Sequence, residues 1–195
     1  MYMNQSNYSK VERGLRRLSF GELQYLCKTE VDVHYVFTAR RSNAQYIDCF
    51  RGYRYEELIS ALGILYHSVR KIMGTNNREN GQESLLDLLH YVPLIANEQK
   101  NENIFYALRQ SLDLSQIAMS DKLGLDVKKL RDLEKGKLLP DNELLWVLYD
   151  LYYIPPAVVL KDPKGLANEL SVLLASLDGR YSRMLYQYIR LLREL

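Results

Sequence analysis

The side chains best suited to acid–base, nucleophilic or metal chemistry are scattered through the chain rather than grouped. Three histidines stand alone at His34, His67 and His90, and the cysteines Cys27 and Cys49 have neither metal-site nor disulfide-framework spacing. The sequence has no glycine-rich phosphate loop, no paired-histidine metal motif and no elbow around a nucleophilic serine. We therefore expect a protein that is not an enzyme and that holds no metal or cofactor.

Length and hydropathy define the class of protein. A chain of 195 residues is long enough for one or two domains with a real core. No apolar stretch approaches the roughly 18 residues that suggest a membrane span, and the first residues lack the basic-then-apolar pattern of a signal peptide. Together with two cysteines that should stay reduced, these features predict a cytoplasmic protein without a membrane segment.

The distribution of charge is more informative than its total. The net charge is +2 at pH 7. Residues 1–41 carry seven Lys or Arg against four Asp or Glu, whereas residues 100–161 carry nine of each. Because a basic surface attracts nucleic acid, the N-terminal segment has the more favourable charge for that partner.

Apolar spacing predicts a chain that is almost entirely helical. It indicates a helix over residues 55–73, a polar loop at 74–81 and a second middle helix near 85–89. Two more helices are expected on either side of Asp178-Gly179. The second of these has an apolar stripe that is too broad to stay exposed, formed by Tyr181, Met184, Leu185, Tyr188 and Leu192.

Residues 102–160 are the most informative stretch, because their spacing predicts five short helices. Ser115 and Asp126 can cap the second and third helices, and Gly124 suits the tight turn between them. Pro140 should begin the fourth helix and a proline pair the fifth. The residues expected to face inward are Ile104, Ala107, Leu108, Leu112, Leu125, Leu130, Leu133, Leu144, Leu145, Leu148 and Leu151.

This stretch resembles the Cro/C1-type, or XRE, family of helix-turn-helix repressors. The resemblance is carried, in order, by Ser115-Gln116-x-x-Met119-Ser120-x-x-Leu123-Gly124-Leu125, then Leu133-Glu134-Lys135-Gly136-Lys137, then Pro140 and Leu144-Leu145. It implies an all-α fold with a five-helix Cro/C1-type helix-turn-helix domain and additional helical segments. In that family the third helix enters the major groove of double-stranded DNA.

The resemblance also implies which side chains contact DNA. It places Val127, Lys128 and Arg131 over base edges, with Lys129 in the same DNA-binding helix and Gln116 near a phosphate or a base. Such a protein would act as a two-fold homodimer, because the dimer sets the spacing between half-sites. We expect the C-terminal stripe or the middle helices to form that interface.

One internal contact follows from the same resemblance. It pairs Arg109 with Glu134 as a structural salt bridge that locks the first helix of the domain to the third. Ser120 replaces the alanine that is usual in the family, which is a mild change.

A second, incomplete copy of the motif lies at the start of the chain. Glu12-Arg13-Gly14 aligns with Glu134-Lys135-Gly136 at an offset of 122 residues. The same offset places Leu23, Leu26, Val36 and Phe37 on Leu145, Leu148, Val158 and Val159, so helices are expected at Gln5–Gly14, Phe20–Lys28 and Asp32–Phe37. The last is expected to be helical despite the β-branched composition of Val31–Thr38. A chance likeness between amphipathic segments is the alternative.

This copy has a more favourable set of polar residues but no counterpart of the first two helices. Its outward positions are Gln5, Ser6, Ser9 and Lys10, with Arg13, Arg16 and Arg17 near for phosphate. Three accounts are open: the sequence starts inside a longer one, the protein has lost the front half of the copy, or the middle segment fills the gap. The chain then divides into an incomplete XRE-like segment at 1–41, a helical middle region at 42–99, the helix-turn-helix domain at 100–161 and C-terminal helices at 162–195.

Two functions from different classes fit the sequence. The first is a DNA-binding transcriptional regulator of XRE type, bacterial or phage. The second is a non-enzymatic interaction module, an antitoxin or phage-type inhibitor that uses the fold to bind a protein partner. Neutral charge over 100–161 and the acids Asp126 and Asp132 beside the contact surface favour the second, because they would repel phosphate.

Overall fold

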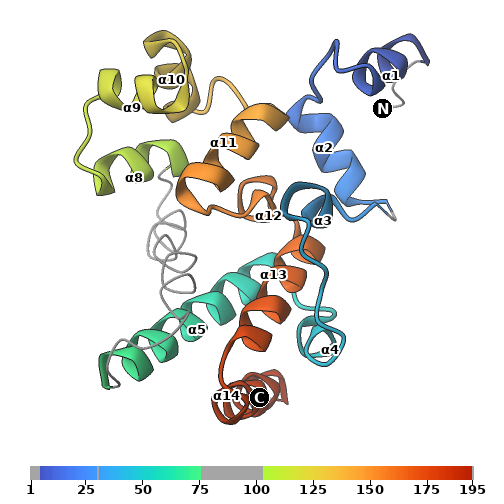
Figure 1. Cartoon of the computed structure of the whole chain (residues 1–195), viewed down its shortest axis with the longest axis vertical. Helices are drawn as coiled ribbons and strands as arrows, with labels where there is room; N and C mark the ends of the chain where they lie inside the picture. The colour runs from blue at the N-terminus through green and yellow to red at the C-terminus, as the bar shows by residue number, and fades with distance from the viewer. Residues whose placement is uncertain (1–4, 30, 76–102, 195) are drawn as a thin grey trace.

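The computed structural model describes residues 5–29, 31–75 and 103–194. Within these ranges every regular element is an α-helix, so the all-α prediction is confirmed. None of the described helices has the length and apolar character needed to span a bilayer. The helices, shown in Figure 1, are α1 Gln5–Glu12, α2 Phe20–Cys27, α3 Val33–Thr38, α4 Ile47–Phe50, α5 Tyr55–Thr75, α8 Ile104–Ser111, α9 Gln116–Leu123, α10 Val127–Glu134, α11 Asn142–Tyr152, α12 Pro156–Leu160, α13 Pro163–Ser176 and α14 Gly179–Glu194.

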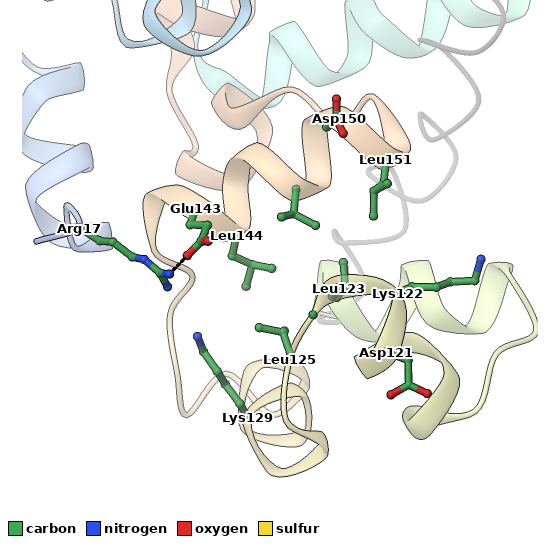
Figure 2. Close-up of a pocket in the computed structure, with 12 residues that line it drawn as sticks. Arg17, Asp121, Lys122, Leu123, Leu125, Lys129, Glu143, Leu144, Asp150 and Leu151 are labelled. Carbon is green, nitrogen blue, oxygen red and sulfur yellow. Dashed lines mark ion pairs between the residues drawn. The ribbon is translucent and has the colours of Figure 1, made fainter. Parts of the chain in front are cut away.

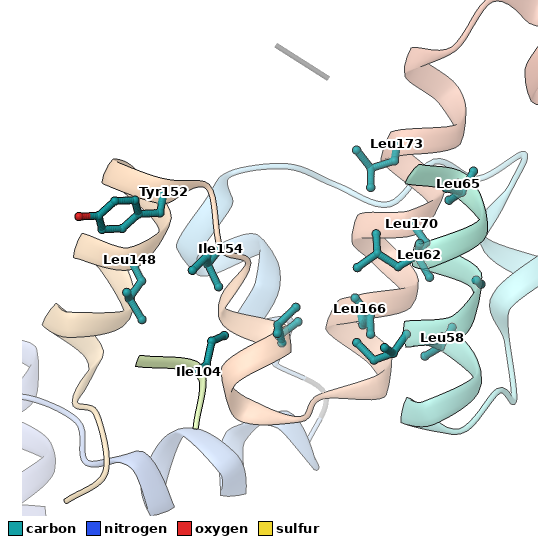
Figure 3. Close-up of a cluster of buried hydrophobic side chains, with 14 of the residues drawn as sticks. Leu58, Leu62, Leu65, Ile104, Leu148, Tyr152, Ile154, Leu166, Leu170 and Leu173 are labelled. Carbon is teal, nitrogen blue, oxygen red and sulfur yellow. The ribbon is translucent and has the colours of Figure 1, made fainter. Parts of the chain in front are cut away.

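Helix α13 lies at the centre of the packing. Its leucines recur every four residues, so Leu166 and Leu170 share one face and both are buried. Figure 3 shows these two side chains beside Leu58 and Leu62 of α5, in the same buried cluster. Helices α3, α4, α12 and α14 also contact α13. Each fully buried leucine contributes roughly 1.5–3 kcal/mol, and these leucines lie in the larger of two apolar clusters, which joins the middle and C-terminal parts of the chain.

Polar contacts hold the segment around α3 on α13. Asn168 Nδ2 donates to Asp32 Oδ2 at 3.0 Å, and Arg40 Nη1 donates to Glu169 Oε1 at 2.9 Å. The backbone N–H of Asn43 donates to a serine hydroxyl of the same helix at 2.9 Å. Burial raises the pKa of the Glu169 carboxyl above its ordinary value, and the Arg40 guanidinium opposes part of that rise.

Helices α1 and α10 have the same local structure at the offset of 122 residues that the sequence indicated. Both run for 8 residues and start and end at equivalent positions. After each helix comes a glycine in the left-handed region, Gly14 at φ 69° and Gly136 at φ 66°, where a residue without Cβ is least strained. Equivalent backbone bonds close the two turns, from Gly14 N–H to Val11 O and from Gly136 N–H to Leu133 O, both at 2.9 Å.

The likeness continues through the next two helices. Ser19 caps α2 by accepting from the backbone N–H three residues later, and Asp141 caps α11 in the same way. The predicted helix within Val31–Thr38 is present as α3 and corresponds to α12. Ala39 and Lys161, which follow α3 and α12, adopt left-handed φ values of 52° and 54°. We call residues 5–39 the first copy and residues 127–161 the second copy.

Two predictions about α11 were wrong. Pro140 does not begin the helix but lies two residues before it, because Asp141 takes the capping position. Leu151 is 47% exposed although we expected it to face inward. The buried row runs through Leu144, Leu148 and Tyr152, every fourth residue, and Leu151 lies beside that row.

The burial of equivalent apolar residues in the two copies differs most at one position. Val36 of the first copy is exposed, whereas its equivalent Val158 is buried. Tyr55 of α5 lies against Val158, and its hydroxyl donates to Val158 O at 2.9 Å. The described part of the middle segment packs on α13, and Figure 1 shows α5 at the other end of the molecule from α1, so this part does not fill the gap before α1.

Other predictions meet the structure only in part. Helix α5 continues through Gly74 and Thr75, so the predicted loop at 74–81 starts too early. In the C-terminal stripe Leu185 is buried by its own chain, whereas Met184 and Tyr188 are exposed. Outside the described residues or side chains lie the rest of that loop, the middle helix near 85–89, Leu192 and the three histidines His34, His67 and His90.

Candidate nucleic-acid interface

Helices α9 and α10 are joined by a short turn, and each helix is capped at its N-terminus by a side chain. Ser115 Oγ accepts from the backbone N–H of Ala118 at 3.1 Å, and Asp126 Oδ1 accepts from that of Lys128 at 2.7 Å. Gly124 between the helices has φ 63°. These are the capping and turn roles predicted from the sequence, and they fix where α10 begins.

Helix α10 presents one apolar row inward and one charged row outward. Leu130 and Leu133 are buried in the core with Met119 of α9. Lys128 and Arg131 are exposed, three residues apart and therefore on one side of the helix. Val127, at the start of the helix, is half-buried, and its hydrophobic surface is only partly available.

Arg109 and Glu134 hold the end of α10 against α8. Arg109 Nε donates to Glu134 Oε1 at 2.5 Å and Nη2 donates to Oε2 at 3.3 Å. Their side chains are only 11% and 4% exposed, and the hydrogen bond to Glu134 raises the pKa of the Arg109 guanidinium. Arg109 Nη1 also donates to Leu114 O at 3.2 Å, which ties the same cation to the loop before α9. The pair expected from the sequence is present.

The side chain of Gln116 joins the Arg109–Glu134 pair and does not extend toward solvent to meet a phosphate. Its Nε2 donates to Glu134 Oε2 at 2.8 Å. A shielded carboxylate is a strong acceptor, so the amide of Gln116 is held inside the protein. The sequence resemblance placed Gln116 near DNA, and the structure shows that its side-chain donor already has an internal partner.

Lys129 is turned away from the exposed row of α10. Its Nζ lies 3.9 Å from Asp141 Oδ2, and the side chain lines a cleft of about 460 Å³ between α9 and α11. Figure 2 shows this cleft with Arg17 of the first copy reaching Glu143 at its edge. Both acids and bases line the cleft, and Asp121 and Lys122 lie on its opposite side.

Further cations and acids complete the charge of this surface. Lys135 and Lys137 are exposed in the turn after α10. The sequence resemblance did not give them a role in DNA binding, although they lie directly after the helix that the resemblance assigns to the major groove. Asp126 is exposed and Asp132 is half-buried at the same helix. The four cations Lys128, Arg131, Lys135 and Lys137 therefore outnumber the two acids.

No family model, curated protein or solved structure matches the chain in comparison. Its function is therefore inferred from the geometry and charge of this surface.

The first copy presents a second exposed helix. In α1, Ser6 and Lys10 are exposed and Ser9 is half-buried, and Arg13 Nη2 donates to Ser9 Oγ at 2.8 Å. Gln5 starts this helix, and its side chain lies outside those described.

Two arginines that the sequence placed near phosphate have internal partners instead. Arg16 Nη2 donates to Glu22 Oε1 at 2.9 Å. Arg17 pairs with Asp141 at 3.5 Å and with Glu143. Acids from the first turn of α2 and from the other copy thus pair with these two arginines, and the partners of Arg17 are too distant in sequence for a local pattern to indicate them.

Proposed function

We propose that this protein is a DNA-binding transcriptional regulator of the Cro/C1, or XRE, type, bacterial or phage, and that it acts on double-stranded DNA through α10. One observation carries the proposal. Leu130 and Leu133 anchor α10 in the core, whereas Lys128 and Arg131 project from its exposed side. A helix with this division can enter a major groove about 12 Å wide and place its cations at base edges and phosphates.

The internal bonds around α10 support the same function. Arg109, Gln116 and Glu134 form a connected, shielded set of hydrogen bonds that fixes the end of the helix. The cap at Asp126 fixes its start. A contact helix held at both ends keeps its exposed side chains in a constant position, which favours binding because little freedom is lost on contact.

A second function is favoured by a specific observation, the acids beside the cations. Asp126 and Asp132 lie on α10, and Lys129 is drawn toward Asp141. Acids at a contact surface repel phosphate but can pair with basic groups of a protein. The alternative is a non-enzymatic interaction module, an antitoxin or phage-type inhibitor that binds a protein partner through this surface.

A salt titration distinguishes the two functions. The protein is titrated onto a random-sequence duplex of about 20 base pairs at several salt concentrations, because binding that displaces counterions weakens steeply as salt rises. The double variant K128E/R131E should lose most of this binding and lower the slope of log K against log salt by about two. Absence of duplex binding by the unaltered protein at low salt would rule out the regulator and leave the interaction module.

The matched control changes the same number of charges elsewhere. Arg180 and Arg190 are exposed on α14, which Figure 1 shows at the opposite end of the molecule from α10. R180E/R190E alters the net charge as much as K128E/R131E does. If both variants weaken binding equally, only the overall charge matters and α10 is not the contact.

A further inference from the structure

The two copies pack against each other through equivalent residues. Leu23 and Leu145 occupy the same position at the offset of 122, and both are buried in one apolar cluster. Val33 and Phe37 of the first copy and Leu160 of the second complete that cluster. Helices α2 and α3 of the first copy both contact α12 of the second.

The contacts between the copies are reciprocal to within one residue. Gln24 Nε2 of the first copy donates to Leu160 O of the second at 3.5 Å. Trp146 is the equivalent of Gln24 in the second copy, and its ring lies 5.3 Å from that of Phe37. Phe37 adjoins Thr38, the equivalent of Leu160. When residue i of one unit contacts j of the other, and j of the first contacts i of the second, the units are related by a two-fold axis.

The arrangement of the helices agrees with such an axis. The backbone N–H of Asn142, the first residue of α11, donates to Leu18 O just before α2 at 3.3 Å. In Figure 1 the first turns of α2 and α11 meet, the two helices then diverge, and α3 and α12 lie between them. Helices α1 and α10 stand on opposite sides of this pair at the same end of the view.

We infer that the chain is an internal pseudo-dimer in which α1 and α10 form the two halves of one bipartite surface for double-stranded DNA. The inference rests on the proposed function for its partner. A single chain then occupies two successive half-sites of a duplex, as two subunits of a symmetric dimer would. The homodimer expected from the sequence is the competing arrangement, because there each half-site would be contacted by a separate α10.

The two halves of the surface differ at equivalent positions. Ser6 of α1 corresponds to Lys128 of α10, and Lys10 corresponds to Asp132. A serine hydroxyl can contact either kind of base pair, whereas lysine and arginine favour guanine. One chain should therefore select two unlike half-sites, and the preferred duplex should not be a palindrome.

The test selects duplexes from a random-sequence pool and measures how many chains bind each one. We expect two unlike half-motifs with centres about 10–10.5 base pairs apart, which is one helical turn, and one chain per duplex by sedimentation. K10E/R13E should erase the half-motif contacted by α1 and lower the salt slope by about two. R180E/R190E, with an equal change of charge, should keep both half-motifs.

Each other outcome overturns the inference in a distinguishable way. A single half-motif, with K10E/R13E behaving like R180E/R190E, means that α1 does not contact DNA although the protein binds it. Two identical half-motifs with two chains per duplex indicate a homodimer that uses α10 twice. If the unaltered protein binds no duplex at low salt, the proposed function fails and the inference fails with it. Lys10 and Arg13 are exposed, and far-ultraviolet circular dichroism checks that the variant is folded.

Discussion

The guanidinium of Arg109 and the carboxylate of Glu134 form a shielded ion pair between α8 and the last residue of α10. Two hydrogen bonds join them, at 2.5 and 3.3 Å. The same carboxylate accepts from Gln116 of α9. One acid therefore receives hydrogen bonds from two other helices, and the orientation of the exposed side of α10 depends on it.

We predict that Arg109→Ala lowers the free energy of unfolding by about 3–5 kcal/mol, because it leaves the Glu134 carboxylate shielded without its cation. Urea unfolding measures the loss. The control is Arg54→Ala, which removes an exposed ion pair with Glu57 and should cost no more than about 1 kcal/mol. Equal losses for the two variants would mean that the Arg109 pair is not shielded in solution.

The sequence was sufficient to predict most helices and the pair that joins α8 to α10. Leucines at helical spacing and capping residues before each helix are local signals, so α8, α9, α10 and α12 start close to the expected positions. The offset of 122 between the copies indicated a helix within Val31–Thr38 against its β-branched composition, because an aligned position carries more information than propensity alone.

The sequence was not sufficient to predict how the elements pack on each other. Periodicity shows which side of a helix is apolar but not which element covers it. Leu151 was therefore predicted to be buried, and Val36 was predicted to match the buried Val158. The structure shows Leu151 and Val36 exposed. Gln116 and Arg17 were predicted to contact DNA for a similar reason. The internal partner of Gln116 is Glu134, at the end of the next helix, and that of Arg17 is Asp141, in the other copy.

A substitution at Gly165 tests how closely the first turn of α13 packs against α12. A Cβ at this position would lie 2.5 Å from Asp162 Oδ2 and 2.9 Å from Ala157 Cβ. We predict that Gly165→Ala lowers the free energy of unfolding by about 1–3 kcal/mol, because a buried site without space must distort. Thermal unfolding followed by circular dichroism measures the change.

The control for this substitution is another helical glycine. A Cβ at Gly63 of α5 would meet nothing within 4 Å. Gly63→Ala should therefore stabilise the protein by about 0.5–1 kcal/mol, since alanine has less freedom to lose on folding. If both alanines had the same effect, the close approach at Gly165 would not exist in solution.

We predict that the free energy of unfolding falls at alkaline pH because the thiol of Cys27 loses its proton. Burial and the neighbouring Asp162 carboxylate raise its pKa from 9.0 to about 12. The folded state therefore holds this proton more tightly than the unfolded state, and the stability that it contributes is complete below pH 9.0 and is lost as pH rises toward 12.

Comparison of the protein with Cys27→Ala isolates this effect from other alkaline titrations. Urea unfolding at increasing pH above 9.0, the ordinary pKa of a thiol, should show the free energy of unfolding falling more steeply for the unaltered protein than for the variant. The difference between the two proteins should thus change with pH. A constant difference would show that the thiol titrates alike in the folded and unfolded states.

The last prediction concerns the docking of the first copy on the second, measured without DNA. Phe37 and Trp146 belong to different copies, and their rings lie 5.3 Å apart in a tilted arrangement. A double-mutant cycle with Phe37→Leu and Trp146→Ala should give a coupling of about 0.5–1.5 kcal/mol, the usual contribution of an aromatic pair. Leucine keeps the buried Phe37 position filled, so the single variant should still fold.

The control cycle combines Trp146→Ala with Leu58→Ala, since Leu58 lies in the other apolar cluster on α5. Those two changes should add to within about 0.3–0.5 kcal/mol, as independent sites do. Coupling in the first cycle and additivity in the second would mean that α3 and α11 contact each other in solution. Additivity in both would mean that Phe37 and Trp146 do not interact in solution. The docking of the two copies would then lack one of the two contacts from which their two-fold relation is inferred, and that inference would lose its support even if α10 alone bound DNA.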